Sequence, residues 1–140
     1  MSVEPLTAAE IQEQLAGSPF IAFMRMTVVS ADPQAQRVVM RLGMRPEFER
    51  GAGSGQWHGG PIAAVIDTVG DFALVMILAR PLPTVNFRVD YLRPAVNTGL
   101  TATATVRRAG RSVGVVDVDV TDDRGGLVAI GRATYYTLAL

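Results

Sequence analysis

The sequence predicts an α+β protein in which an antiparallel β-sheet wraps around one long central helix. A long apolar run, residues 61–79, lies between a glycine-rich segment and a pair of prolines. Several segments that alternate apolar and polar residues follow it, with turn residues between them. Because the long run is apolar on nearly every side, it needs cover all round, and a curved sheet can provide that cover.

The N-terminal part is expected to form a short helix and a hairpin. In residues 6–17, Thr7 and Glu10 have the capping-box spacing, and Gly17 follows as a stop signal. Residues 24–30 and 37–42 are rich in valine and methionine and flank the turn-prone segment SADPQAQ, so we expect an antiparallel hairpin. The broken, glycine-rich segment 43–60 is long enough to be a functional loop.

The C-terminal part is expected to form the long helix and four strands. The helix should start at Gly59 or Gly60, with Pro61 in its first turn, and end before Pro81. Alternating patterns predict strands in residues 85–91, 100–108, 112–122 and 127–138. The turn segments NTG, AGR and DDRGG between them predict that all four strands are joined in order by tight hairpins.

Composition restricts the function. A length of 140 residues fits one domain, residues 1–140, and the 13 basic and 13 acidic residues give no charged face for nucleic acid. The chain lacks cysteine and any His/Asp/Glu cluster with ligand spacing, so we expect no metal. No secretory pattern opens the chain, and two aspartates in the apolar run argue against a membrane span, which favours a cytoplasmic protein without a membrane partner. The 49% hydrophobic content predicts contact with a second copy.

Asp67 and Asp71 lie on one face of the predicted helix, together with Leu74 and Leu78. We expect this face to meet solvent or a second subunit, and the two leucines favour the subunit. Asp71 fits best a solvated side chain or one that bonds across the interface. Asp67 is the candidate general base, because a carboxylate among apolar neighbours suits that task.

The HGGP segment supplies a second candidate group. Gly59 and Gly60 lie at the helix N-terminus, where free N–H groups favour an anion or a developing oxyanion. Asp67 lies about 10 Å further along the axis, so one substrate carbonyl cannot contact both. We therefore predict a composite site, with Gly59 and Gly60 from one chain and Asp67 from an antiparallel second copy.

Three segments carry a family resemblance: GQWHGGPIAAVID, TVNFRVDYLRPA and RRAGRSVGVVDVDVTDDRGGLVAIGRATYY. With them the chain resembles the hotdog-fold acyl-CoA thioesterases of the PaaI type, the phenylacetic acid degradation group. The resemblance implies that Asp67 is general base or nucleophile, that the Gly59 N–H supports the oxyanion with His58 beside it, and that Thr84 positions the attacking water. It also implies a homodimer, commonly paired into a homotetramer.

The resemblance further implies that CoA, as part of the substrate and not as a cofactor, runs along residues 91–96 and the turn at 108–113. The candidate substrate contacts are Gln56, Trp57, Gly60, Tyr91, Arg93, Arg108, Gly110 and Arg111, and the arginines suit phosphate. One departure is Ala52, where relatives often have asparagine. Gln56 or Ser54 is the candidate replacement.

Hydrolysis of a small, medium-chain or aromatic acyl-CoA is the preferred function. Two alternatives stay open at this point. One is an acyl-CoA binding or sensing protein without catalysis, which the missing asparagine allows. The other is an enoyl-CoA hydratase-like hotdog enzyme, although the proline-rich segment that follows the histidine in that branch is missing.

Overall fold

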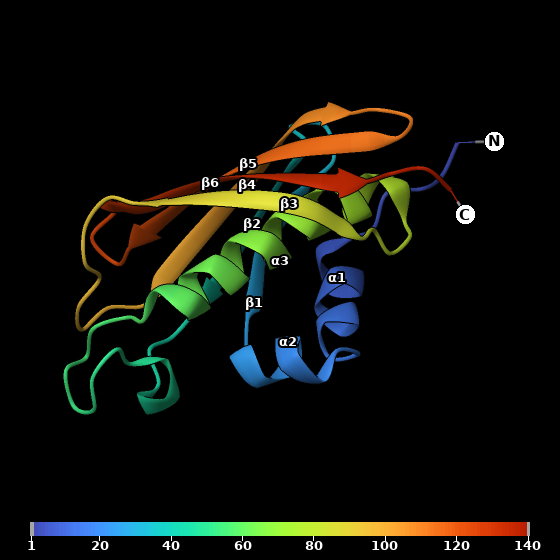
Figure 1. Cartoon of the computed structure of the whole chain (residues 1–140). Coiled ribbons are helices and arrows are strands. Elements are labelled where there is room, and N and C mark those ends of the chain that lie inside the picture. Colours follow the sequence, from blue (N-terminus) through green and yellow to red (C-terminus); the bar gives the residue numbers. More distant parts are fainter. Residues whose placement is uncertain (1, 140) are drawn as a thin grey trace.

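A curved antiparallel sheet lies against a single long helix, with two short helices beside them (Figure 1). The structure is a computed structural model that describes residues 2–139. In chain order its elements are α1 (Ala8–Leu15), α2 (Pro19–Met24), β1 (Thr27–Asp32), β2 (Arg37–Leu42), the 3₁₀ turn η1 (Pro46–Phe48), α3 (Gly59–Leu78), β3 (Thr84–Tyr91), β4 (Leu100–Ala109), β5 (Val113–Asp122) and β6 (Leu127–Tyr136).

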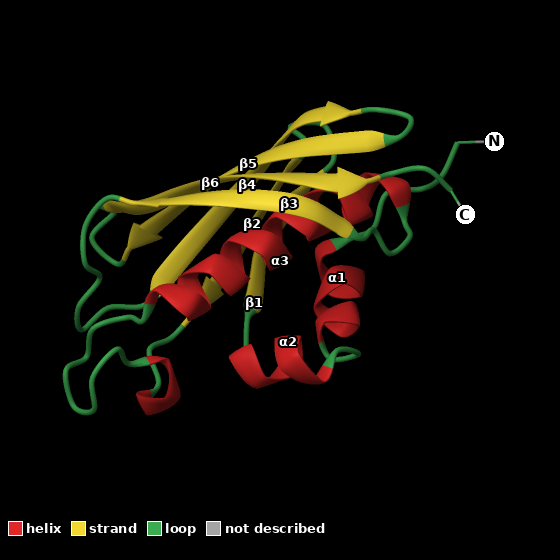
Figure 2. Cartoon of the chain, viewed as in Figure 1, coloured by secondary structure: helices red, strands yellow, loops and turns green. Residues whose placement is uncertain are grey.

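The sheet has six strands in the order β1-β2-β4-β5-β6-β3, and every neighbouring pair is antiparallel. Figure 2 shows α3 beneath the concave face of this sheet, with α1 and α2 further out. Helix α3 contacts five of the six strands closely, β2 to β6. The predicted fold class, a sheet wrapped around a long central helix, is confirmed.

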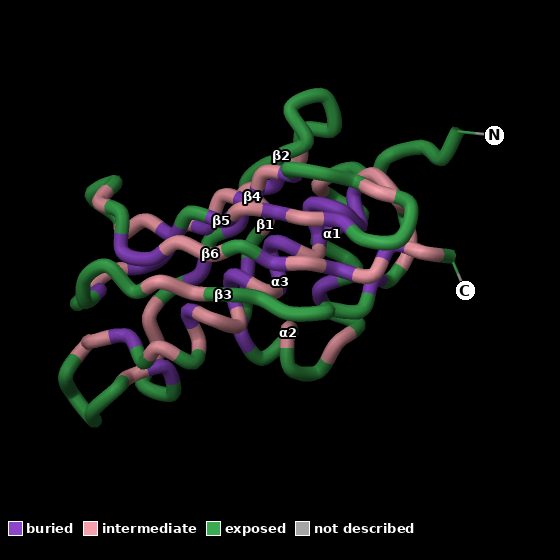
Figure 3. Tube along the Cα trace, turned by 45° about the horizontal axis from the view of Figure 1, so that its top comes forward, coloured by how far each residue is buried: buried purple, intermediate pink, exposed green. Residues whose placement is uncertain are grey.

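Helix α3 begins and ends as the sequence predicts. His58 is its N-cap, and the chain leaves it at Ala79 in a left-handed conformation (φ 52°). Its buried residues belong to the hydrophobic core, and Figure 3 colours much of α3 as buried. Two glycines let the sheet approach it, because a Cβ would lie 2.5 Å from the Ile66 side chain at Gly131 and 2.6 Å from the Leu74 side chain at Gly114.

The predicted hairpin between the strands at 84–91 and 100–109 is wrong. Strand β3 pairs with β6 at the far edge of the sheet, with Tyr91 opposite Ala129. The connecting residues cannot close a hairpin, because they bond to the loop that precedes α3. The Trp57 N–H donates to the Ala95 carbonyl at 2.9 Å, and the Asn97 N–H donates to the Gly55 carbonyl at 2.9 Å.

Two further expectations are wrong, one about where the first strand starts and one about what Leu74 contacts. The first strand starts at Thr27 instead of Met24, because Ser18 caps the short helix α2 with Pro19 in its first turn. Leu74 does not face a second subunit as expected, because it is buried in the chain's own core and 0% exposed. The predicted capping box at Thr7 and Glu10 is present in α1.

Helix α3 is long and apolar enough to cross a membrane by length and composition. It is the core helix of the fold, with eleven of its twenty residues buried. The sequence-based preference for a core helix over a membrane span therefore agrees with the structure.

Candidate active site

The N-terminus of α3 opens into a pocket of about 410 Å³, which we call the amide pocket. The His58 Nδ1 atom accepts a hydrogen bond from the Gly60 N–H at 2.9 Å, so this amide is already occupied. The Gly59 N–H has no acceptor among residues 2–139. The Gly59 carbonyl accepts from the Tyr91 hydroxyl at 2.6 Å, which holds the Gly59–Gly60 peptide, the one next to the peptide that carries the free N–H. Of the two glycines, Gly59 is therefore the one with an amide free for an oxyanion.

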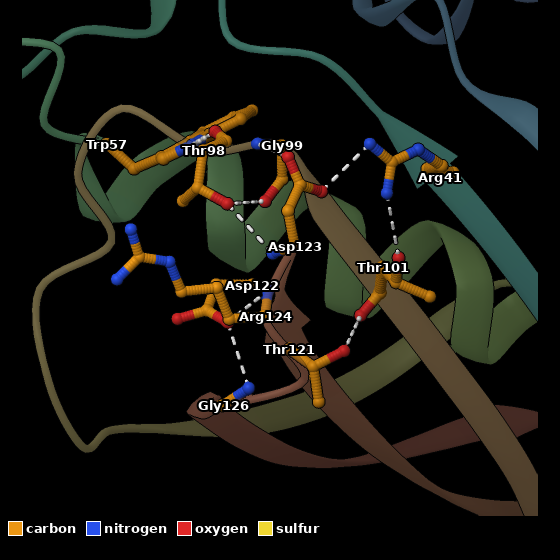
Figure 4. Close-up of polar contacts among 10 residues, drawn as sticks. All are labelled: Arg41, Trp57, Thr98, Gly99, Thr101, Thr121, Asp122, Asp123, Arg124 and Gly126. Atoms are coloured by element: carbon orange, nitrogen blue, oxygen red, sulfur yellow. Dashed lines mark hydrogen bonds and ion pairs between the residues drawn. The ribbon is translucent and has the colours of Figure 1, made fainter.

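A network of hydrogen bonds to neighbouring turns holds the loop before α3 in position (Figure 4). The indole N–H of Trp57 donates to the Thr98 carbonyl at 2.8 Å, and the ring is stacked on Phe48 with 5.4 Å between centroids. The Thr98 hydroxyl in turn accepts from the Asp123 N–H at 2.9 Å, which links this loop to the β5–β6 turn. Trp57 is 3% exposed but still lines the amide pocket, so it both packs and borders the site.

Half of the predicted substrate contacts come together in the amide pocket, along with two of the predicted catalytic residues. Its lining includes Gln56, Trp57, His58, Gly59, Tyr91 and Arg93. The Arg93 guanidinium is held by Asp122 at 2.7 Å and stays half exposed. Of the two replacements considered for the missing asparagine, only Gln56 lines the pocket, because the Ser54 hydroxyl accepts from the Gln56 backbone N–H instead.

Asp67 and Thr84 lie in a different hollow of about 260 Å³, which we call the acid pocket. The Thr84 hydroxyl donates to Asp67 Oδ1 at 2.8 Å. The Tyr135 hydroxyl, from β6, donates to the Asp67 backbone carbonyl at 2.6 Å and fixes the helix at this turn. A threonine hydroxyl that donates to a carboxylate keeps its lone pairs free to accept from water. The arrangement therefore suits water activation.

Asp71 lines the acid pocket one turn beyond Asp67. Its Oδ1 atom is shielded from solvent and has no hydrogen-bond partner among the described residues. Burial first, and the negative charge of Asp67 second, raise the pKa of Asp71 to about 7. The expectation of a solvated side chain holds only in part, because the residue is half-buried and one of its carboxyl oxygens is shielded, and whether Asp71 bonds across an interface stays untested.

Within one chain the predicted catalytic residues are divided between two pockets that share no lining residue. Gly110 and Arg111 line a third hollow, at the C-terminal end of α3, with Arg108 packed against Gly110. Helix α3 has 20 residues, which at 1.5 Å per residue places this hollow about 30 Å from Gly59. No group of three or more His, Cys, Asp or Glu residues that could hold a metal is found in residues 2–139.

Sequence reasoning missed the wall of the acid pocket that α2 forms. This wall consists of Ser18, Phe20 and Ile21. The Ser-Pro pair is a helix-start signal that could have located α2, although nothing local shows that α2 lies beside Asp67. Arg50 of the amide pocket was missed too, since it comes from an irregular segment that carries no such signal, whereas Leu92 and Pro94 fall within the segment 91–96 that the resemblance assigns to CoA.

Comparison with known proteins places this fold and site in a family. Residues 54–129 match the family described as the thioesterase superfamily, so more than half of the chain is covered. A Halobacterium salinarum protein named provisionally as an esterase is 32% identical over 91% of this chain and 90% of its own. The chain belongs to the thioesterase superfamily.

One further relative agrees with this assignment in sequence, and one solved structure agrees with the fold. The medium/long-chain acyl-CoA thioesterase YigI of Escherichia coli is 33% identical over 56% of this chain and 60% of its own length. The solved structure of the Escherichia coli PaaI protein, from the phenylacetic acid degradation operon, is 22% identical, covers 92% of this chain and 91% of its own, and has a TM-score of 0.80. The predicted hotdog fold and thioesterase class are confirmed.

Proposed function

We propose that the protein hydrolyses the thioester of an acyl-CoA to the free acid and CoA, at a site shared between two copies of the chain. The observation that carries this proposal is the separation of the free Gly59 amide from the Asp67–Thr84 pair within one chain. Each pocket holds half of the groups that hydrolysis needs. The names of relatives such as YigI support an acyl-CoA substrate.

In the proposed reaction the thioester carbonyl oxygen accepts a hydrogen bond from Gly59 of one copy. Asp67 of the other copy takes a proton from water that Thr84 orients, and the water oxygen bonds to the carbonyl carbon. The C–S bond then breaks, and the departing thiolate takes up the proton. Direct attack by Asp67, with water cleaving the resulting anhydride, gives the same products and remains the alternative route.

The outer edge of the sheet supports pairing of two copies. Strand β3 ends the sheet and has no neighbour on its outer side among the described strands. Two of its apolar side chains are exposed, Val85 by 56% and Phe87 by 39%. An apolar edge strand favours pairing with another chain. Antiparallel pairing of two β3 strands would place the α3 helices side by side in opposite directions.

The same arrangement assigns roles to the remaining predicted contacts. In an antiparallel pair, the C-terminal end of one α3 lies towards the N-terminal end of the other. The turn with Arg108, Gly110 and Arg111 would then approach the partner copy's amide pocket, where Arg93 and Tyr91 lie. We assign CoA to this surface, because guanidinium groups suit phosphates. The proposal needs no cofactor, since CoA is part of the substrate.

An assay with a panel of small, medium-chain and aromatic acyl-CoAs and a thiol reagent tests the proposal. We expect release of free CoA, and an Asp67→Asn variant should lose about 10²- to 10⁴-fold in kcat, because the base contributes that much to such reactions. Tight binding without release would favour an acyl-CoA sensor instead. Loss of enoyl absorbance without release would favour a hydratase.

Three narrower expectations remain predictions. They are a cytoplasmic location, a single domain over residues 1–140, and assembly of dimers into a homotetramer. The assay above also determines which acyl group of the panel the protein prefers.

A further inference from the structure

The acid pocket contains a second carboxyl group that hydrolysis by Asp67 does not explain. Asp71 and Asp67 are four residues apart on α3, which places them on one face about 6 Å apart at their Cβ atoms. Both line the same hollow, yet the Asp71 Oδ1 atom is buried without a partner in the described part of the chain. An ionised carboxylate in such a place is costly, whereas a neutral carboxylic acid costs far less.

We propose that Asp71 is a positioning residue that is protonated in the working enzyme and donates its O–H to the Asp67 carboxylate, directly or through one water. This inference depends on the proposed hydrolysis. The Thr84 hydroxyl already donates to Asp67 Oδ1, so the two donors hold the carboxylate from two sides. Such a carboxylate keeps its charge and orientation while it activates water.

The groups around Asp71 decide how its protonation responds to pH. Asp67 is the other carboxylate in the hollow, and neither the α2 wall nor Thr84 of β3 adds a charge. Tyr135 of β6 is the titratable group behind the helix, and burial raises its pKa above the usual range, so it stays neutral. In the proposed pair of copies, His58 of the second copy also lies near.

The pH response then follows from the raised pKa of Asp71, about 7. Below that pH the side chain is neutral and can donate to Asp67. Above it, Asp71 loses the proton, the donated hydrogen bond disappears, and a second negative charge repels the Asp67 carboxylate. Turnover should therefore fall as the pH rises through neutrality.

The kinetic test measures kcat against pH with the best acyl-CoA from the panel. Wild-type kcat should fall above about pH 7 by at least about tenfold, towards the level expected when the donated hydrogen bond is lost. Asp71→Asn keeps a neutral donor of the same shape, so its profile should lack this alkaline fall. Asp71→Ala has no donor, and its kcat should be about tenfold below that of the Asn variant, with little change in KM. Asp119→Asn, on the exposed outer face of β5, is the matched control and should keep the wild-type profile.

A second measurement does not depend on turnover. Carbon NMR of the Asp71 carboxyl should give a titration midpoint near neutral pH, and the midpoint should move down in Asp67→Asn, because a neighbouring negative charge is lost. An ordinary acidic midpoint, or an alkaline fall that persists in Asp71→Asn, would overturn the proposal. If no acyl-CoA is hydrolysed while the coupled titration is present, the proposed function fails and the hydrogen-bonded pair stands.

Discussion

Thr84 and Asp67 form one hydrogen-bonded pair although they come from different elements. Thr84 opens β3, and its hydroxyl bonds the Asp67 carboxylate across 2.8 Å. A hydrogen bond to a charged acceptor is stronger than one between neutral groups, and here it also fixes the direction of the carboxylate. The geometry makes Thr84 the candidate that holds both the base and the attacking water.

We expect Thr84→Val to lower kcat by about 10- to 100-fold with a smaller change in KM, because the shape is kept while a charge-assisted hydrogen bond is lost. Thr84→Ser keeps the hydroxyl and should recover most of this loss. Steady-state kinetics of the two variants is the measurement. Equal kcat values for the Val and Ser variants would show that the hydroxyl has no part in turnover.

At the scale of single residues, the sequence identified the candidate base and the candidate amide but not the residues that surround them. The spacing between HGG and Asp67 is meaningful because helix geometry is local, so seven residues along one helix fix a distance. The burial of Asp71 depends on α2, which is nearly fifty residues away in the sequence. No local pattern carries that information.

At the scale of elements, close contact between α3 and the sheet fixes where the two pockets lie. A Cβ at Gly131 would lie 2.5 Å from Ile66 Cγ2 and 3.0 Å from the Arg88 carbonyl oxygen. Real Cβ atoms do not approach other atoms so closely, so a side chain there must push β6 and α3 apart. This helix–sheet contact therefore requires glycine at position 131.

We expect Gly131→Ala to destabilise the protein by about 1–3 kcal/mol, as overpacking of a dense core does. Gly43→Ala is the matched control, since nothing lies within 4 Å of its added Cβ. Urea unfolding of the two variants and the wild type at one protein concentration measures the difference. Equal midpoints for both variants would contradict the tight contact.

The elements themselves could be predicted from the sequence better than their pairing. Caps and alternation located α1, α3 and the strands because those signals are local. The partner of β3 could not be found this way, since β6 lies more than thirty residues further along the chain. The turn residues near Asn97 mark where the chain changes direction, but hydrogen bonds to Gly55 and Trp57 determine which strand β3 pairs with.

At the scale of the whole molecule, the proposed hydrolysis requires two copies of the chain that complete each other's site. One α3 carries a free amide at its start and a carboxylate about 10 Å further on, too far apart to act on one carbonyl. In the proposed reaction each chain therefore offers two half-sites. A symmetric pair with antiparallel α3 helices would form two complete sites from four halves.

Complementation between two inactive variants tests this claim most directly. Asp67→Ala removes the carboxylate, and Gly59→Val blocks the amide, because a Cβ at Gly59 already lies 3.1 Å from the Tyr91 ring. Each variant alone should lose about 10²- to 10⁴-fold in turnover. Mixed dimers, purified through two different affinity tags, contain one intact site of two, so we predict about half the wild-type turnover per dimer. Mixed dimers no more active than their parents would contradict the shared site.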